Sequence, residues 1–339
     1  MALFVALGRK FAESAIAFGS QMKLSNLHLV AIIGQVILPA WMVNAEQATT
    51  AVAGGILQAD SMKAGLPLSS RVVALTAKGS DAVANIGASN ASAYAFNRPA
   101  GAPDNIVVVV EENHGYSQII GNPDAAYINS LAAAGTLFTN YHAVSHPSEP
   151  NYFALFSGST QGITGDGTYF FANAPTLAGE LRQAGYSFVG YAEPPIDRDH
   201  TPWLSFGDSE GVGQAFSQFP TDFTKLPTVS FVSPNLLNDM HDGSIAKGDR
   251  WLNVNLSAYA NWAMTHNSLL VVTFDEDQGT TNNRVATIVV GDGVGAGQSD
   301  QLTDHYALLH TVETLYGLPP LAASATARVM SFAPPNGAP

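Results

Sequence analysis

Two apolar stretches of this sequence each run directly into acidic residues. Residues 106–110 are an unbroken β-branched run and lead into Glu111-Glu112-Asn113-His114, and residues 269–274 lead into Asp275-Glu276-Asp277. Continuous apolar runs of this length are typical of strands that are buried on both faces of a parallel sheet. Because sites in open α/β sheets lie beyond the carboxyl ends of the strands, the two runs indicate both the fold class and the edge that carries the function.

Strands and helices alternate along the rest of the chain. We expect further strands at 136–141, 187–191, 229–232 and 285–290, and helices at 123–134, 148–158, 177–184, 249–265 and 306–316. Gly135, Gly185 and Gly317 follow three of these helices, as expected of helix ends. The alternation predicts an α/β fold with a mostly parallel central sheet and helices on both of its faces.

The acidic residues at the strand ends suggest a cation site. Clustered carboxylates repel one another unless a cation or protons intervene, and oxygen and imidazole ligands suit a divalent metal ion. The alternative for either motif alone is an ordinary polar loop after a strand. The chain has 27 acidic and 14 basic residues, a net charge of −13, and shows no basic stripe of the kind that binds nucleic acid. It has no cysteine, which excludes a thiol nucleophile, disulfides and thiolate metal sites.

A serine lies at the start of one expected helix. In His146-Pro147-Ser148-Glu149-Pro150-Asn151-Tyr152, Pro150 fits the first helical turn. Ser148 then falls at or near the N-cap, where free backbone N–H groups form an anion site. Two interpretations remain open from the spacing: Ser148 is a plain helix cap, or it is a nucleophile whose phosphorylated form those N–H groups hold.

Two later segments carry further candidate ligands. Asp239-Met240-His241-Asp242 follows the expected strand at 229–232 and is either a ligand cluster or a turn held by Asx hydrogen bonds. In Asp304-His305, the aspartate is a candidate cap for the last helix. A lone histidine such as His305 is more often structural than a ligand.

Taken together, these motifs resemble those of the acid phosphatase and phospholipase C type phosphoesterase family, which belongs to the alkaline phosphatase superfamily. The resemblance runs from about Asp104 to Leu318, and its most specific part is the serine segment. The segments that carry it are Glu112-Asn113-His114, 146–152, His200-Thr201-Pro202-Trp203, 238–242 with Gly248-Asp249, Phe274-Asp275-Glu276, and His305-Tyr306 with Leu315-Tyr316-Gly317. The resemblance implies an alkaline-phosphatase-like fold.

The resemblance also implies a divalent metal ion as cofactor. Positions that match metal ligands of the family are Glu112, Asn113, Ser148, Asp275 and Glu276; Asp239, His241 and His305 match positions that hold a second metal or the leaving-group region in relatives. Ser148 matches the nucleophile. We expect Asn151 and the helix N-terminus to bind phosphoryl oxygens, and His241 or His200, the latter matching a histidine near the phosphate, to protonate the leaving group.

The length of the chain favours the short, exported acid phosphatase branch of this family, which includes phosphatases of phosphatidylinositol 3-phosphate. We therefore expect a metal-dependent acid phosphatase that hydrolyses phosphate monoesters, with a phosphoinositide lipid headgroup as one candidate substrate, through a phosphoserine intermediate. Two alternatives remain: a phosphodiesterase or phospholipase C that uses the same site, and a non-catalytic exported binding protein.

The N-terminal region predicts export. Residues 24–45 carry no formal charge, Lys23 precedes them, and Val43-Asn44-Ala45 matches a signal-peptidase site. We expect a signal peptide at 1–45 with Met22 as an alternative start, a weakly structured leader at 46–103 that is rich in Ala, Gly, Ser and Asn, and a phosphoesterase domain at 104–339. No stable membrane span should remain after processing, and the enzyme should be periplasmic or secreted. An uncleaved anchor or a buried helix are the alternatives for 24–45.

The first prediction follows from the cleavage motif. The exported protein should begin at Glu46, because cleavage is expected after the small residue Ala45. N-terminal sequencing of protein recovered outside the cytoplasm tests this, and an exported protein that still begins at Met1 or Met22 would contradict it.

Overall fold

The computed structural model describes residues 57–59, 75–77 and 98–334. The predicted signal peptide and most of the predicted leader lie outside these residues. The chain divides into two units, Met1–Ala95 and Phe96–Pro339. In the first unit, β1 (Leu57–Ala59) pairs antiparallel with β2 (Leu75–Ala77). The second unit contains all the predicted site residues.

The second unit alternates strands and helices as the sequence predicts. Its strands are β3 (Asn105–Glu111), β4 (Thr136–His142), β5 (Phe188–Ala192), β6 (Gly213–Ala215), β7 (Val229–Ser233), β8 (Ser268–Phe274), β9 (Arg284–Gly291), β10 (Gly297–Ser299) and β11 (Thr303–Asp304). Its α-helices are α5 (Tyr116–Ile119), α6 (Ala126–Ala134), α7 (Ser148–Ser157), α8 (Leu177–Gln183), α9 (Ile245–Ala263) and α10 (His305–Tyr316). Short 3-10 helices are η4 (Pro123–Ala125), η5 (Pro202–Leu204), η6 (Gly207–Ser209), η7 (Phe216–Gln218), η8 (Phe223–Lys225) and η9 (Ala322–Thr326). Among the helices of the described residues, none has the length and hydropathy needed to cross a bilayer.

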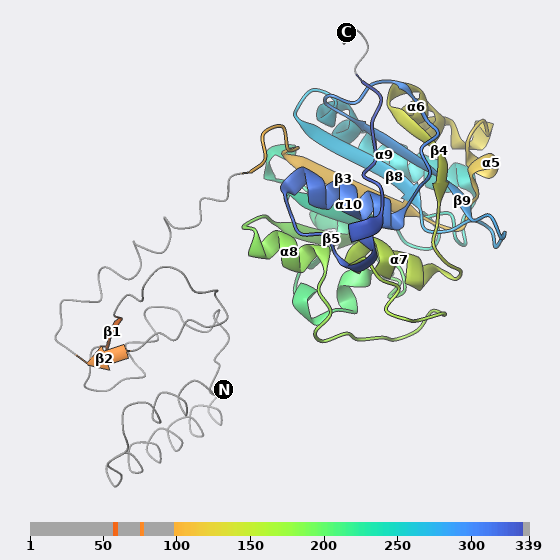
Figure 1. Cartoon of the computed structure of the whole chain (residues 1–339). Coiled ribbons are helices and arrows are strands. Elements are labelled where there is room, and N and C mark those ends of the chain that lie inside the picture. Colours follow the sequence, from red (N-terminus) through yellow and green to blue (C-terminus); the bar gives the residue numbers. More distant parts are fainter. Residues whose placement is uncertain (1–56, 60–74, 78–97, 335–339) are drawn as a thin grey trace. The chain divides into compact units, whose positions relative to one another are not determined.

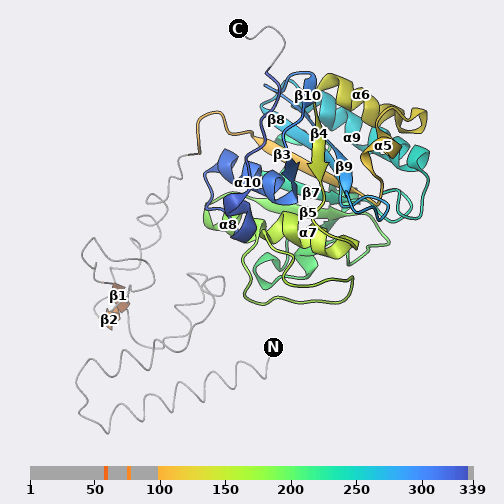
Figure 2. The same ribbon diagram turned by 45° about the vertical axis from the view of Figure 1, so that its right-hand side comes forward.

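One mixed sheet of nine strands organises this unit. The strand order is β10-β4-β9-β8-β3-β7-β5-β6, with β11 beside β4. Every neighbouring pair is parallel except those of β9, which runs antiparallel to β4 and to β8. Helices lie on both faces: α6 and α9 pack together over β8 and β9, and α7, α8 and α10 lie on the opposite side (Figures 1 and 2). The predicted fold class is confirmed.

The reversal of β9 follows from the short connection before it. Only residues 275–283 link β8 to β9, whereas a parallel return needs a crossover of a dozen residues or more. The acidic segment after β8 is therefore held in a tight connection rather than leading into a helix.

The two apolar runs of the sequence form the centre of the sheet. Every residue of β3 and of β8 is buried, as expected of strands covered on both faces. The two strands pair in parallel, with Glu111 opposite Phe274. Glu112 and Asp275 therefore leave neighbouring strands side by side.

Helix α9 begins four residues earlier than the sequence predicts. Its N-cap is Ser244, whose side chain accepts a hydrogen bond from the Lys247 N–H. Gly248 lies inside this helix. A glycine is required there because a Cβ at this position would lie 2.4 Å from Met240 Cγ. The glycine marks a close approach to the 235–243 loop and not a helix boundary.

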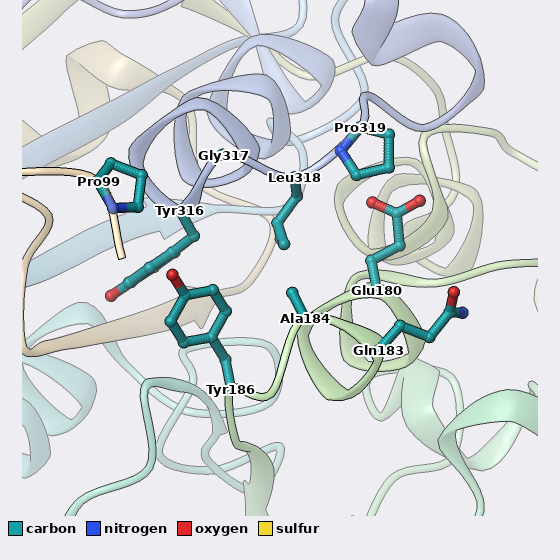
Figure 3. A pocket seen from close by; sticks show the side chains of 9 residues that line it. All are labelled: Pro99, Glu180, Gln183, Ala184, Tyr186, Tyr316, Gly317, Leu318 and Pro319. Carbon is teal, nitrogen blue, oxygen red and sulfur yellow. The ribbon is translucent and has the colours of Figure 1, made fainter. Parts of the chain in front are cut away.

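A cavity of about 330 Å³ lies at the C-terminal end of α10, away from the strand ends that carry the predicted site (Figure 3). Tyr186 and Tyr316 form one wall, with ring centroids 5.1 Å apart, and the Glu180 side chain lies below Pro319 (Figure 3). Glu180 Oε2 is buried without a hydrogen-bond partner among residues 98–334. Burial, together with the charges of Glu313 and Asp208, raises the pKa of Glu180 to about 7.

This raised pKa makes stability depend on pH. The folded state holds the Glu180 proton up to about pH 7, while an unfolded glutamate loses it near its ordinary pKa of about 4.3. Folding is therefore progressively destabilised as pH rises through that window. Glu180→Gln removes the charge and keeps the shape. We expect it to stabilise the protein near pH 8 by on the order of 1 kcal/mol, the full shift being discounted for partial exposure.

Thermal unfolding of both proteins at acidic and at alkaline pH measures the effect. The gain in melting temperature should vanish below the unfolded pKa, because Glu180 is then neutral in both states. A constant offset at all pH values would show that the Glu180 charge is not its cause.

Candidate active site

Five segments beyond the carboxyl ends of five strands of the sheet build the candidate site. Glu112 follows β3, Ser148 follows β4, His200 follows β5, Asp239 follows β7 and Asp275 follows β8. These strands are parallel to one another, so their carboxyl ends share one edge of the sheet. This is the edge at which the sequence predicts the site.

A buried group of Glu112, His200 and Asp239 forms the centre of the site. Their ligand atoms lie within 4.8 Å of one another. Glu112 Oε2 is 3.4 Å from His200 Nε2, and Asp239 Oδ2 is 3.5 Å from His200 Nδ1. Ser148 Oγ lies 3.2 Å from Glu112 Oε2. The predicted nucleophile therefore lies against the group of candidate ligands.

Asn113 connects Ser148 to Asp275. Its side-chain Oδ1 lies 3.4 Å from Ser148 Oγ, and its backbone N–H donates to Asp275 Oδ1 at 3.1 Å. The residue has a φ of 53°, a left-handed conformation that Asn adopts more readily than most residues. This sharp bend directly after β3 lets one residue contact both side chains.

The carboxylates in and beside this group repel one another. Burial raises the pKa of Glu112 well above its usual range, and the nearby charges of Asp275 and Asp239 raise it further. Burial also raises the pKa of Asp239, although His200 offsets part of that effect. For His200, burial favours the neutral ring, but contact with Asp239 and the charge of Asp275 outweigh burial and raise its pKa. The Glu112 and Asp239 carboxylates are therefore stable in ionised form only beside additional positive charge.

The residues present fit a divalent cation. Asp275 Oδ2 is buried without a hydrogen-bond partner in the described part of the chain, and Asp239 Oδ2 and His200 Nδ1 have only each other, at 3.5 Å, whereas buried polar atoms normally have a hydrogen-bond partner. Carboxylate oxygens with an imidazole nitrogen are a donor set for divalent metal ions. Glu112, Asp239 and His200 are the residues best placed to hold such an ion. The sequence prediction had given His200 a role near the phosphate rather than in this group.

Ser148 does not cap its helix. The N-cap of α7 is Pro147, and no side chain caps the helix. The Ser148 hydroxyl is directed toward Glu112 and Asn113 instead. Of the two interpretations that the sequence left open, the structure excludes the cap.

Asn151 has a different role from the predicted one. Its Oδ1 accepts hydrogen bonds from the N–H groups of Val144 and Ser145, both at 3.0 Å, and its Nδ2 donates to the carbonyls of Ser145 and Pro147. These four bonds use the full capacity of the amide. The structure therefore does not support Asn151 as a ligand of phosphoryl oxygens. It fixes the segment that leads into Ser148.

His305 contacts the backbone of Asp275 and is not one of the candidate metal ligands. Its Nε2 contacts the Asp275 carbonyl at 2.6 Å, and its Nδ1 contacts the Tyr141 hydroxyl at 3.0 Å. Burial lowers the pKa of His305, which favours the neutral ring. Because a carbonyl only accepts, Nε2 carries the proton and Nδ1 accepts from Tyr141. Neither nitrogen has a lone pair free for a metal ion. Asp304, as expected, caps α10 by accepting from the Ala307 N–H.

The two residues of the predicted ligand pair Asp275-Glu276 have side chains with different partners. Asp275 faces Asn113, whereas the Glu276 carboxylate is paired with His146 Nδ1. His146 is held in turn by the Thr280 carbonyl, 3.0 Å from its Nε2. Glu276 therefore fixes the segment before Ser148 to the β8–β9 connection, and the structure does not bring it to the group of candidate ligands.

His241 lies at the rim of the site. Its side chain is 38 % exposed and its ring centroid is 5.8 Å from that of His200. Asp239 Oδ1 accepts from the His241 N–H at 2.8 Å, so this segment is both the Asx-type turn and the source of a candidate ligand. Met240, between them, has a φ of 79°, a strained conformation for a bulky residue. The turn leaves Asp239 buried and His241 accessible to a substrate.

Tyr152 is a site residue that the sequence reasoning missed. Its hydroxyl donates to Glu112 Oε1, and its ring stacks on His200 with centroids 5.3 Å apart. Tyr152 is four residues after Ser148 on α7, so the two side chains share one helix face. That spacing was the available signal. Tyr152 orients both a carboxylate and the imidazole of the candidate metal site.

Comparison with known proteins identifies the family of this chain. Residues 122–319 match the profile of the Phosphoesterase family. A phosphatidylinositol-3-phosphatase of Mycobacterium tuberculosis is 49 % identical over 230 residues, which cover 63 % of this chain and 77 % of that protein. An acid phosphatase of Aspergillus fumigatus is 31 % identical over 268 residues, covering 69 % of this chain but only 58 % of the fungal protein.

The fold has a counterpart among solved structures. The crystal structure of a protein in the alkaline phosphatase superfamily from Vibrio parahaemolyticus superposes with a TM-score of 0.50 and 14 % sequence identity, covering 66 % of this chain and 70 % of that chain. At this identity the likeness concerns the fold alone, and it confirms the alkaline-phosphatase-like architecture.

The position of Tyr152 generates a prediction about cation binding. Tyr152→Phe removes the hydroxyl that holds Glu112 and keeps the stacked ring. We expect affinity for Mg²⁺, Mn²⁺ or Ca²⁺ to fall about 10- to 100-fold, the usual effect of removing a residue that orients a ligand. Stability should change by only about 1 kcal/mol. Titration calorimetry measures the affinity.

Tyr259→Phe is the matched control. It also removes a buried tyrosine hydroxyl, one that donates to the Leu269 carbonyl at the amino end of β8. It should cost similar stability and leave cation affinity unchanged. Equal cation affinity in Tyr152→Phe and the unmodified protein would refute the assigned role.

Proposed function

Because this chain belongs to the Phosphoesterase family and is a phosphoric ester hydrolase of the acid phosphatase type, we propose that it hydrolyses phosphate monoesters through a phosphoserine on Ser148. One observation carries the proposal: the Ser148 hydroxyl caps no helix and lies 3.2 Å from Glu112 Oε2 and 3.4 Å from Asn113 Oδ1. A hydroxyl so placed, beside a buried set of candidate metal ligands, is suited to nucleophilic attack.

We further propose that the enzyme depends on a divalent cation held by Glu112, Asp239 and His200, with Asn113 and Asp275 beside them. The buried oxygens Asp239 Oδ2 and Asp275 Oδ2, which lack hydrogen-bond partners among residues 98–334, support this. When bound, such a cation offsets charge on phosphoryl oxygens and lowers the pKa of a nearby hydroxyl.

The protein side chains account for the proton movements. Ser148 Oγ attacks phosphorus in line with the leaving oxygen, whose bond to phosphorus breaks, and Glu112 Oε2 is placed to accept the Ser148 proton. His241, exposed at the rim, donates a proton to the leaving oxygen. In the second step water attacks the phosphoserine and gives a proton to His241, the bond between Oγ and phosphorus breaks, and Ser148 recovers its proton from Glu112.

The names of the relatives favour a monoesterase. Both proteins compared above are phosphatases by name, which supports monoester hydrolysis over the phosphodiesterase or phospholipase C alternative and leaves the non-catalytic alternative without support. The bacterial relative, 49 % identical, acts by its name on a phosphoinositide, so we propose a phosphoinositide headgroup as a substrate.

The apolar run at 24–45 with its cleavage motif supports the proposal that the enzyme is periplasmic or secreted.

The test of the proposed function is Ser148→Ala. We expect kcat for an aryl phosphate monoester to fall by at least about a thousandfold, equivalent to about 4 kcal/mol of barrier. The melting temperature should stay nearly constant, because the hydroxyl caps nothing. Mass spectrometry of acid-quenched unmodified enzyme should find phosphate on Ser148. Substantial kcat in Ser148→Ala would overturn the mechanism.

Ser157→Ala is the control on the same helix. Ser157 is buried and its hydroxyl donates to the Phe153 carbonyl, so its loss should lower stability and leave kcat per folded molecule unchanged. Parallel assays on an aryl phosphodiester separate the monoesterase from a phosphodiesterase.

A further inference from the structure

A second cavity borders the candidate active site and has no part in the proposed chemistry. It measures about 380 Å³ and lies on the N-terminal half of α9. The residues that matter for its chemistry are Asn238, Ser244, Lys247, Arg250, Trp251 and Val254. Two of these are cations, in a chain whose net charge is −13.

The cavity and the candidate active site share the 235–243 loop. Asn238 lines the cavity, and the next residue, Asp239, belongs to the buried group of candidate ligands. The Asn238 side chain donates to Glu193 Oε2 at 2.8 Å, and a Cβ on Gly248 of α9 would lie 2.9 Å from the Asn238 carbonyl oxygen. The first turns of α9 are thus packed against this loop, which fixes the cavity beside the active site.

Lys247 and Arg250 are unpartnered cations. Both are exposed, and neither forms a salt bridge or a side-chain hydrogen bond with any described residue. Arg182 and Arg328 are exposed and unpartnered among the described residues as well, but neither lines this cavity. By contrast, Arg98 pairs with Asp104, and Arg284 lies over the Tyr116 ring. An arginine fork beside a lysine suits a phosphate group, and the nearby positive end of α9 adds to the attraction.

Exposed apolar side chains flank the cations. Val254, in the cavity wall, is 75 % exposed, and Leu237, the neighbour of Asn238, is 50 % exposed. Trp251 lines the cavity between Lys247 and Val254 along the helix. Basic residues beside exposed aliphatic side chains are typical of surfaces that bind anionic bilayers.

We propose that the Lys247/Arg250 cavity binds the phosphate group of an anionic phospholipid headgroup and thereby docks the enzyme on a bilayer beside its active site. The proposal rests on the proposed function for the lipid nature of the substrate and extends it with a binding site separate from Ser148. A lipid headgroup is favoured over free phosphate because Leu237 and Val254 offer apolar contacts that an inorganic ion would not use.

The test is vesicle co-sedimentation of Lys247→Gln/Arg250→Gln. Vesicles of phosphatidylcholine alone are compared with vesicles that also contain phosphatidylinositol. The unmodified protein should prefer the anionic vesicles, and the preference should weaken with salt. The double variant should bind them about 30-fold more weakly, since each basic residue near such a surface contributes about 1 kcal/mol.

The matched control is Arg182→Gln/Arg328→Gln, which removes the same charge from two exposed positions outside the cavity and should leave vesicle binding nearly unchanged. Equal losses in both double variants would overturn the proposal, because the effect would then be one of net charge. Calorimetry of inorganic phosphate binding to Lys247→Gln/Arg250→Gln is a second measurement. If this variant loses phosphate binding but keeps vesicle binding, the proposal of a lipid docking site is also overturned.

Turnover separates this proposal from the proposed function. The Lys247→Gln/Arg250→Gln variant should keep kcat and KM on a soluble aryl phosphate and show a raised KM on a phosphoinositide presented in vesicles. If the unmodified enzyme hydrolyses neither substrate, the proposed function fails, while the vesicle comparison still decides the docking site.

Discussion

The crowding of three carboxylates at one edge of the sheet is the constraint on which the rest of the site depends. Glu112, Asp239 and Asp275 follow three neighbouring parallel strands, β3, β7 and β8, so the strand order alone brings like charges together. Burial raises the pKa of both Glu112 and Asp239, and the charges of Asp275 and Asp239 raise the pKa of Glu112 further. The surrounding polar contacts are best understood as responses to this repulsion, because a site of this kind persists only if its charges are oriented and compensated.

Much of that orientation comes from residues that do not contact the carboxylates themselves. Asn151 uses all of its hydrogen bonds on the segment before Ser148, and His305 holds the backbone of Asp275. The result is a rigid frame, in which backbone N–H groups and buried side chains fix the direction of each functional group before any ligand arrives. Such preorganisation is what gives hydrogen bonds and charges their catalytic value.

The sequence predicted the location of the site better than the directions of its side chains. Strands β3 and β8 and the ends of α6, α7 and α10 follow from local patterns, because apolar periodicity and terminal glycines depend only on near neighbours. The direction of Glu276 depends on His146, a residue 130 positions away in sequence, and no local pattern contains such a partner. The role of His305, which contacts Tyr141 164 positions away, was missed for the same reason. The partners of Asn151 lie only four to seven positions before it, but they belong to a loop without a periodic pattern. Tyr152 differs, since its spacing from Ser148 was visible in the sequence.

The parallel pairing of β3 with β8 has a consequence for how the protein acquires activity. The hydrogen bond between Asn113 and Asp275 joins residues separated by 162 positions, so the site depends on contacts of high contact order, which form slowly. A chain that has not yet joined β8 to β3 has the serine but lacks the arrangement around it. Catalytic competence is therefore a late product of folding: a nascent or unfolded polypeptide is inert toward phosphate esters until its central strands have met.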